Sequence, residues 1–439
     1  MRVSNKKIIN DEDKFTQLFP KYQTIVTRLT QTYSIDEANT YSKLVNFQKN
    51  LSSPKHGWYD YKQGYSEELV QRVIKMSNPN FESYILDPFC GVGTTNLTVQ
   101  SMGYRSIGVD VNPMAVLATT VKTHHYTEDD IIELRGRIDN FELPTHEEAI
   151  YAGKVIETSF TPEVLSILLK LRYYVEQIKN DYIQRFFRLA LISILDKCSL
   201  KVKDGNGLKF KKNYKEVPDL VGLFIDKCKL MLSDIESVNY EAECKCFLGS
   251  MLNDDLFDSV KNEKVGLCVF SPPYANCFDY CEVYKLELWI GGFVKSYEDF
   301  EKFRSMALRS HVNSKFNHFI RNNNEDVDII ADLISAFNIW NKNIPDMIRG
   351  YFDDMELLLK RVYQMLVEGG RCYIVVANSA YKGILVPTDM LLANIAEQIG
   401  YKFKTIQVAR KIRSSSQQMK GLYETYDNLM RESIVVLEK

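Results

Sequence analysis

One short segment, in which a strand, a glycine turn, a helix and a second strand follow each other, constrains this fold most strongly. Residues 83–89 read SYILDPF, an apolar strand pattern, and residues 94–103 have the pattern of a helix that closes at Gly103. A second strand is predicted over residues 105–112. Strand, helix and strand in this order predict the opening of a parallel α/β sheet.

Five more strand patterns follow, and helical patterns separate several of them. No amphipathic helix is evident between the last two, which predicts a terminal antiparallel pair. We therefore expect an α/β fold whose sheet ends in that pair. The strand patterns cover residues 242–249, 264–270, 371–378, 401–409 and 432–439, and helices are predicted over 355–370 and 387–400.

The glycine turn indicates what the sheet binds. Gly91 and Gly93 follow the first strand at its carboxyl end, where open α/β sheets bind ligands, and glycine lets the backbone approach a ligand closely. No lysine follows Gly93 as a P-loop requires, and Asn96 stands where a dinucleotide fingerprint has its third glycine. Asp110, after the second strand, offers a carboxylate to two ribose hydroxyls. A ribose ligand without phosphate is predicted, and S-adenosylmethionine fits; the alternative is a structural turn with Asp110 capping a helix.

A second motif, SPPY, directly follows the strand pattern of residues 264–270. Two consecutive prolines remove two N–H donors and stiffen the loop. The Ser271 hydroxyl and the Pro272 carbonyl can accept hydrogen bonds from an exocyclic amine, and Tyr274 can stack on a base. This loop is suited to methyl transfer from a sulfonium to an amine without a covalent intermediate. Taken alone, the same four residues also occur in ordinary loops.

Together the two motifs resemble those of the SPPY-type amino-methylating DNA methyltransferases, which modify cytosine N4 or adenine N6 in bacterial restriction-modification systems. DPFCGVGTT is similar to the family's cofactor motif and SPPY to its catalytic motif. The resemblance implies a class I methyltransferase (Rossmann-like) sheet, S-adenosyl-L-methionine as cofactor and double-stranded DNA as substrate. It assigns Asp87, Phe89, Gly91, Gly93 and Asp110 to the cofactor, and Ser271, Pro272, Pro273 and Tyr274 to catalysis.

Other parts of the pattern match the family less closely. Residues 61–79 are similar to the segment that holds the methionine end of the cofactor, which implies roles for Lys62 and Ser66. The family often has an acidic residue after the third strand. Here Ser250 occupies that position, and Asp254 and Asp255 come a turn later, so the residue that contacts adenine stays open. The cofactor motif also precedes the catalytic motif, whereas many SPPY enzymes have the opposite order.

The spacing of the strands locates insertions. Residues 113–241 separate the second and third strands, far more than the roughly 30 residues of a βα unit, and helical patterns over 161–198 and 217–235 predict a mainly helical inserted domain. Between these helices, residues 201–215 concentrate lysines around a DGNG turn, and phosphate contacts are expected there; the alternative is a solvated loop. Residues 291–345 and 409–421 are further basic segments. The DNA-binding candidates are Lys209, Lys211, Lys212 and Arg413.

Composition limits the remaining possibilities. The net charge is −2, so nucleic acid must meet a local basic patch. The chain begins without the apolar region of a signal peptide and has no run of roughly 18 apolar residues, which predicts a cytoplasmic protein with no membrane partner. The nine cysteines form no CxxC pairs and are interpreted as reduced thiols, with no metal site.

These observations lead to one functional expectation. The chain is expected to methylate the N4 amine of a flipped cytosine in duplex DNA, with adenine N6 or a tRNA guanine-N2 amine as the alternative targets and a cognate restriction endonuclease as a partner. The division that we expect is an N-terminal helical extension (1–60), the first catalytic part (61–124), the helical insertion with the target-recognition region (125–241), the SPPY part (242–290), a cover for DNA or base (291–350) and the end of the catalytic domain (351–439).

Overall fold

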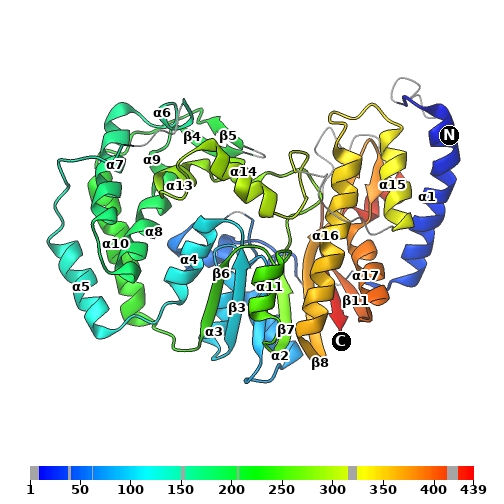
Figure 1. The fold of residues 1–439 in the computed structure, drawn as a ribbon, viewed down its shortest axis with the longest axis horizontal. Helices are drawn as coiled ribbons and strands as arrows, with labels where there is room; N and C mark the ends of the chain where they lie inside the picture. The colour runs from blue at the N-terminus through cyan, green and yellow to red at the C-terminus, as the bar shows by residue number, and fades with distance from the viewer. Residues whose placement is uncertain are drawn as a thin grey trace.

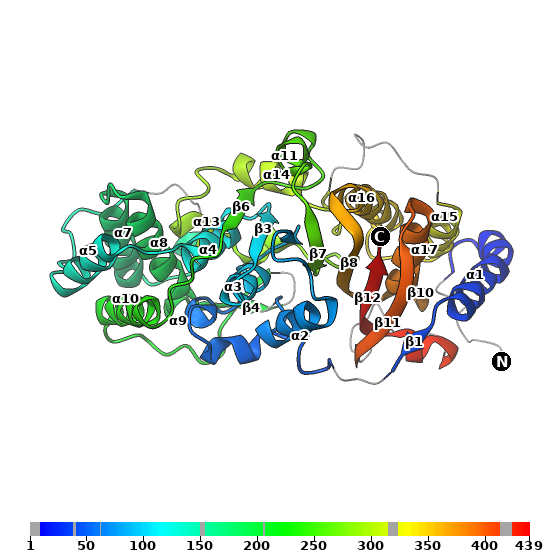
Figure 2. The ribbon, with the colours of Figure 1, turned by 90° about the horizontal axis from the view of Figure 1, so that it is seen from below.

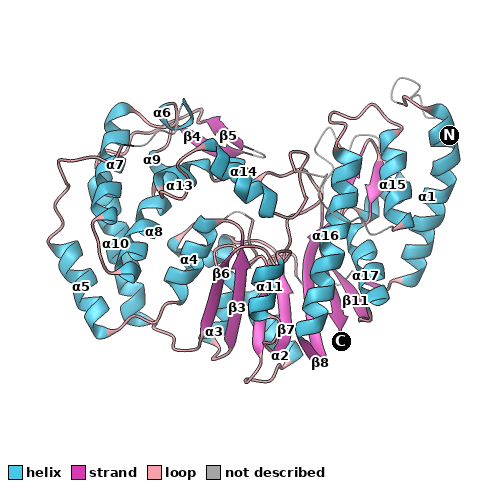
Figure 3. Cartoon of the chain, viewed as in Figure 1, coloured by secondary structure: helices cyan, strands magenta, loops and turns pink. Residues whose placement is uncertain are grey.

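The computed structural model describes residues 9–37, 41–61, 63–149, 154–204, 207–314, 324–412 and 424–439. Within these ranges, eight strands form one twisted central sheet (Figures 1 and 3). Along the sheet the strands are β1 (Ile35–Asp36), β11 (Lys402–Lys411), β12 (Arg431–Glu438), β8 (Leu366–Ala377), β7 (Val265–Phe270), β2 (Tyr84–Asp87), β3 (Arg105–Asp110) and β6 (Cys244–Leu248).

The strand directions confirm the expected class I sheet. β8, β7, β2, β3 and β6 are mutually parallel, whereas β12 runs antiparallel to both of its neighbours, β8 and β11. The predicted terminal antiparallel pair is therefore β11 and β12, and β12 is inserted between β11 and the parallel strands. Because parallel strands end at one edge, the loops after β2, β3, β6 and β7 meet there.

Each face of the sheet packs against its own helices (Figure 2). Alternate residues of β7 supply the two cores: Leu267 and Val269 pack on one side, and Cys268 and Phe270 on the other. The first face carries α2 (Glu67–Ser77), α3 (Thr94–Ser101) and, beyond them, α4 (Pro113–Thr123), and the second carries α11 (Asp254–Val260), α16 (Ile344–Met365) and α17 (Thr388–Ile399).

A helical layer with its own apolar core lies beyond β6, at one end of the sheet (Figure 1). The predicted helical stretch 161–198 is broken into three helices, because Asn180 caps a new helix with its side chain. The layer contains α5 (Glu128–Asp139), α6 (Lys154–Glu157), α7 (Pro162–Glu176), α8 (Asp181–Ser193), α9 (Leu195–Cys198), α10 (Leu220–Ser237) and α13 (Lys285–Ile290), and α12 (Tyr280–Val283) and α14 (Tyr297–Met306) flank α13.

The lysine-rich stretch between these helices is a hairpin rather than a loop. β4 (Lys201–Asp204) pairs antiparallel with β5 (Gly207–Phe210). Lys203 anchors the hairpin, since its ammonium forms ion pairs with Glu287 and Asp196 and its side chain is only 5% exposed. The Lys203 side chain is therefore too buried to contribute to a basic surface patch.

The opposite end of the sheet is covered by the N-terminal segment and a second group of helices. α1 (Glu12–Thr32) packs against α15 (Glu325–Ser335), and β1 extends the sheet beside β11. A small hairpin, β9 (Ser379–Tyr381) with β10 (Ile384–Val386), lies nearby. The helix predicted over 355–370 begins earlier and ends at Met365, because Leu366 already pairs with β7. None of the described helices has the length and apolar character that crossing a membrane requires.

Candidate active site

The turn between β2 and α3 can be made only with glycine at two positions. Gly91 has a φ of +52° and Gly93 a φ of +79°. A Cβ atom at Gly93 would lie 2.8 Å from Thr119 Oγ1 and 3.1 Å from Thr119 Cα. At Gly91 it would lie 3.0 Å from the ring of Tyr61. The turn is therefore packed closely on both sides, and its backbone forms part of the wall of a pocket.

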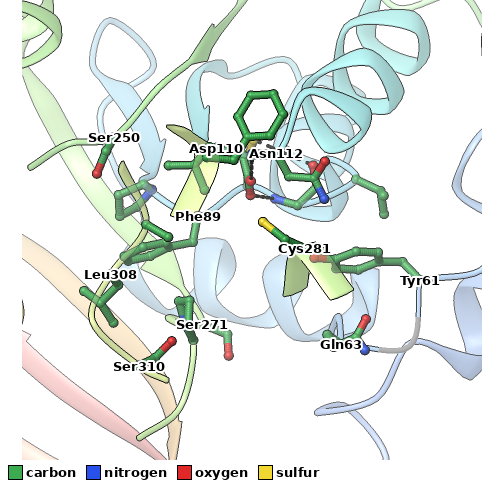
Figure 4. A pocket seen from close by; sticks show the side chains of 18 of the residues that line it. Tyr61, Gln63, Phe89, Asp110, Asn112, Ser250, Ser271, Cys281, Leu308 and Ser310 are labelled. Carbon is green, nitrogen blue, oxygen red and sulfur yellow. Dashed lines mark hydrogen bonds between the residues drawn. The ribbon is translucent and has the colours of Figure 1, made fainter. Parts of the chain in front are cut away.

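Asp110, at the end of β3, lies across this turn (Figure 4). Its Oδ2 accepts a hydrogen bond from the Gly91 amide at 2.9 Å, and its Oδ1 accepts one from the Asn112 amide at 2.8 Å. The alternative role for Asp110, capping the next helix, belongs to Asn112, whose side chain accepts from the Met114 amide at 3.0 Å. Both oxygens of Asp110 are thus held by backbone amides of residues that line the pocket.

A second carboxylate, Asp87, lies under the same pocket. It accepts hydrogen bonds from the Phe89 amide and the Tyr65 hydroxyl, both at 3.0 Å. Burial raises the pKa of Asp87 and of Asp110 to about 6. Among the described residues, neither carboxylate forms an ion pair with a lysine or arginine. At neutral pH the site therefore holds two buried negative charges, which favours a ligand that brings hydroxyl donors and a positive charge.

The pocket is closed by segments that lie far from the turn in the sequence. Tyr61 and Gln63 form one side, and Tyr61 stacks on Tyr284 with 5.5 Å between ring centroids. Residues 303–311 form another side, and Figure 4 shows Leu308 and Ser310 facing the cavity. The sequence pointed to both segments, the first for the methionine end of the cofactor and the second as a cover for DNA or base, but it did not identify these residues. The lining residues that it missed include Tyr61, Gln63, Asn112, Asp279, Cys281, Leu308 and Ser310.

Most of the predicted cofactor residues meet at this pocket. Ser250, after β6, lines it, whereas Asp254 forms an ion pair with Arg361 and Asp255 is exposed outside it. Gly93 shapes the turn without lining the cavity. Ser66 is fully buried at the start of α2 and does not reach the cavity, and Lys62 lies outside the described residues. The predicted residues on the wall are Asp87, Phe89, Gly91, Asp110 and Ser250.

The SPPY loop separates this pocket from a second cavity. Ser271 and Pro273 line the first pocket, and Pro272 is buried. Tyr274 lines the second cavity, of about 340 Å³, where its hydroxyl donates to Glu432 Oε1 at 2.6 Å. That volume falls at the low end of small-molecule sites, roughly 300–1,000 Å³. The remaining walls come from Asn276, Ala377, Asn378, Ser379, Ala380, Tyr381, Arg410, Lys411 and Ile412.

Comparison with known proteins shows which families this chain resembles. A family model described as DNA methylase matches residues 4–120. The type II methyltransferase M.BsoBI of Geobacillus stearothermophilus is 26% identical, over 96% of this chain and 93% of that protein. The type II methyltransferase M.AvaI of Nostoc sp. is 25% identical, over 94% of this chain and 92% of that protein. These matches support an amino-methylating DNA methyltransferase of the kind found in restriction-modification systems. The chain is a methyltransferase that takes S-adenosylmethionine as its cofactor and acts on DNA.

A shorter relative is a tRNA (guanine(10)-N2)-dimethyltransferase of Methanothermobacter thermautotrophicus. It is 28% identical, but over only 23% of this chain and 30% of that protein. The two type II methyltransferases, in contrast, align with almost the whole methyltransferase, including its inserted helices.

The first pocket of the methyltransferase fits S-adenosylmethionine by its donors and charges. When bound, this cofactor supplies a methyl group on a positively charged sulfur. Asp110 would accept hydrogen bonds from the two ribose hydroxyls, and the Gly91 turn allows the close approach that this contact needs. Arg304, the arginine of the lining, is held by Asp279 at 3.0 Å and by Glu282, so it is not arranged for a phosphate.

Replacing Asp110 by alanine is expected to weaken cofactor binding by about 1–3 kcal/mol, because two hydrogen bonds to a charged acceptor are lost. Calorimetry with S-adenosylmethionine measures the change. The wild-type affinity should also fall as the pH drops through about 6, since the pKa of Asp110 lies there and only the ionised form accepts both hydroxyls. Unchanged affinity in a folded Asp110→Ala protein would remove this residue from the site.

The predicted DNA-binding lysines differ in their availability. Lys209 on β5 is exposed and pairs with the exposed Asp204. Lys212 is also exposed, whereas the ammonium of Lys211 donates to the Asp196 carbonyl at 2.6 Å. Arg413 lies outside the described residues. Of the three predicted lysines, Lys209 in the hairpin and Lys212 just after it are the two best placed to contact phosphates.

Two cysteines near the catalytic loop are not suited to covalent catalysis. Burial raises the pKa of the Cys277 thiol to about 11. Burial, with the neighbouring Asp279 carboxylate, raises the pKa of Cys281 to about 12. Because the thiolate is the nucleophile, neither sulfur is activated at neutral pH.

Proposed function

We propose that the methyltransferase transfers a methyl group to the exocyclic N4 amine of a cytosine that is flipped out of duplex DNA. The observation that carries this proposal is the position of the SPPY loop between two cavities. Ser271 lines the cavity suited to the cofactor, and Tyr274 lines the other. A base in the second cavity would have its amine near Ser271, on the side of the methyl donor.

The choice of cytosine rests on Ser271. The family resemblance associates serine at the head of this loop with cytosine N4, and aspartate or asparagine with adenine N6. A hydroxyl accepts a hydrogen bond from the amine while leaving the site less negative than a carboxylate would. The Tyr274 ring offers a flat face for the extruded base, and stacking of this kind contributes about 1–3 kcal/mol per base.

The reaction needs no covalent bond between enzyme and base. The high pKa values of the Cys277 and Cys281 thiols support direct transfer. The protein's part is to hold the amine in line with the methyl group and to accept its proton. Ser271 would orient the amine, and the Tyr274 ring would hold the base.

Mass spectrometry of nucleosides tests this proposal. Duplex DNA and total tRNA are incubated with the protein and labelled S-adenosylmethionine, then digested. We expect labelled N4-methylcytosine from DNA and no labelled nucleoside from tRNA. N6-methyladenine would overturn the base assignment but keep the reaction class. N2-methylguanosine from tRNA, or 5-methylcytosine from DNA, would overturn the proposed function.

The hairpin β4–β5 is proposed to contact the DNA backbone. Replacing Lys209 and Lys212 by alanine should weaken DNA binding across sequences and reduce the salt dependence by up to about two phosphate contacts, with cofactor affinity unchanged. Filter binding between about 50 and 200 mM salt measures the slope. The matched control removes two exposed lysines on the face of the sheet that carries α11 and α16: Lys261, directly after α11, and Lys360, in α16. An equal slope in both double variants would place the DNA contacts elsewhere.

A cognate restriction endonuclease is the remaining proposed partner. It follows from the family, whose members protect the sites that such an enzyme cuts. If DNA modified by the methyltransferase resists one endonuclease of a panel, the recognition sequence of that endonuclease identifies the methylated site.

A further inference from the structure

Glu432 is a buried carboxylate beside the catalytic loop, and no motif predicted it. It lies at the start of β12 and is 4% exposed. One of its oxygens, Oε1, accepts the Tyr274 hydroxyl at 2.6 Å, and the other, Oε2, accepts Nε of Arg410 from the neighbouring strand β11. All three side chains line the second cavity. The carboxylate is therefore fixed in place with one oxygen toward the loop.

The hydrogen bonds run in one direction from the loop to this carboxylate. The Ser271 hydroxyl donates to the Tyr274 oxygen at 3.4 Å, and the Tyr274 hydroxyl donates to Glu432. The first distance is longer than the 2.7–2.8 Å typical between hydroxyls, and such contacts shorten when a substrate is bound. Because the Ser271 hydrogen points to Tyr274, its lone pairs stay available to an amine on the other side.

We propose that Glu432 receives the proton that the target amine loses, through Ser271 and Tyr274. This inference rests on the proposed function. A serine hydroxyl is too weak a base to keep that proton, and Glu432 is the carboxylate to which the hydrogen-bond chain leads. Since it acts through Tyr274 and Ser271, Glu432 is a positioning residue rather than one that contacts the base.

The step balances in atoms and charge. The amine nitrogen forms a bond to the methyl carbon as the bond from that carbon to sulfur breaks, and the sulfur keeps the electron pair as a neutral thioether. The nitrogen then gives a proton to Ser271 Oγ, whose own hydrogen passes to Tyr274. The Tyr274 hydrogen passes to Glu432, which becomes a neutral carboxylic acid. One positive charge on sulfur and one negative charge on the carboxylate disappear together.

The groups that face Glu432 come from three parts of the chain. Arg410 faces it from β11, the uncharged Tyr274 from the loop, and Ala377 is its partner on β8. Lys411 lines the same cavity. The positive charge of Arg410 therefore lies beside Glu432, and each of the two Glu432 oxygens accepts a hydrogen bond.

Glu432→Gln tests the inference, since glutamine keeps an acceptor for Tyr274 but cannot take up the proton. With saturating cofactor and a DNA fragment that the wild type methylates, we expect the single-turnover rate to fall about 100-fold. Cofactor affinity by calorimetry and DNA affinity by filter binding should stay within about twofold. At saturating cofactor, the wild-type rate should fall more steeply towards acidic pH than the rate of the variant, which has no carboxylate at this position. Glu438→Gln, on the same strand and paired with Arg371, is the matched control and should behave as wild type.

Tyr274→Phe provides a second break in the same chain without disturbing the pair of Glu432 and Arg410. It should lose as much rate as Glu432→Gln, and the double variant should lose no more than either single one. A wild-type rate and pH profile in either single variant, or fully multiplicative losses in the double variant, would overturn the relay. The relay is tested only with wild-type protein that makes N4-methylcytosine. If the wild type makes no N4-methylcytosine, the proposed function itself is wrong.

Discussion

Replacing Asp389 by alanine is expected to destabilise the methyltransferase by about 3–5 kcal/mol, the usual cost of leaving a buried charge without its partner. Asp389 is fully buried in the first turn of α17. It accepts Nε of Arg431 at 2.8 Å and the Ser433 hydroxyl at 3.0 Å. Arg431 is only 2% exposed, so the guanidinium cannot reach water when the carboxylate is removed.

Urea unfolding of the wild type and the variant measures this loss. The matched control is Asp258→Ala, which removes a carboxylate from an exposed pair with Lys261 at 2.8 Å, and a change below about 1 kcal/mol is expected there. Arg431 is next to Glu432 in β12, so the Asp389 variant should also weaken methylation in the fraction that stays folded. If Asp389→Ala costs no more than the surface control, the buried pair is not part of what holds β12 against α17.

Replacing Tyr274 by alanine should reduce the single-turnover rate of methyl transfer about 1,000-fold. Two contributions are removed together: the stack on the flipped base, worth about 1–3 kcal/mol, and the hydroxyl that passes the proton, worth about 100-fold. Cofactor affinity should change little, because the Tyr274 side chain lines the second cavity and the cofactor residues line the first.

Tyr274→Phe separates the two contributions, since phenylalanine keeps the ring and loses the hydroxyl. The difference between the alanine and phenylalanine variants then gives the contribution of stacking, expected to be about tenfold or more. Rapid-quench measurement with labelled cofactor follows the rate, and thermal unfolding confirms that each variant is folded. A loss below about tenfold in Tyr274→Ala would mean that the base is held by other residues.

The central features of the fold and the first pocket could be predicted from the sequence because they depend on local chemistry. The turn needs glycine at positions 91 and 93 because both residues have a positive φ. Asp110 lies at the same edge of the sheet because β2 and β3 are parallel neighbours. The paired prolines of SPPY stiffen their own loop. Each of these features involves residues within about one βα unit, so pattern and spacing were sufficient.

Other features depended on contacts between distant segments. In the sequence, the lysines around the hairpin form one basic cluster. In the structure, Lys203 is buried in an ion pair with Glu287 of α13, and the Lys211 ammonium donates a hydrogen bond to a backbone carbonyl of α9. Residues 303–311, predicted only as a cover for DNA or base, also line the cofactor pocket. The sequence does not indicate which charged side chains will be buried by contacts with distant segments.

Glu432 shows the same limit at the site itself. In the sequence it is one acidic residue at the start of a strand, without a motif, and Tyr274 stands far before it. Only the insertion of β12 between β8 and β11 brings its carboxylate to the Tyr274 hydroxyl. The cofactor turn and the catalytic loop could thus be predicted from local sequence, because backbone conformation and short spacing define them. The contact of Glu432 with the catalytic loop became evident only in the folded chain, because strand order is a property of the whole sheet.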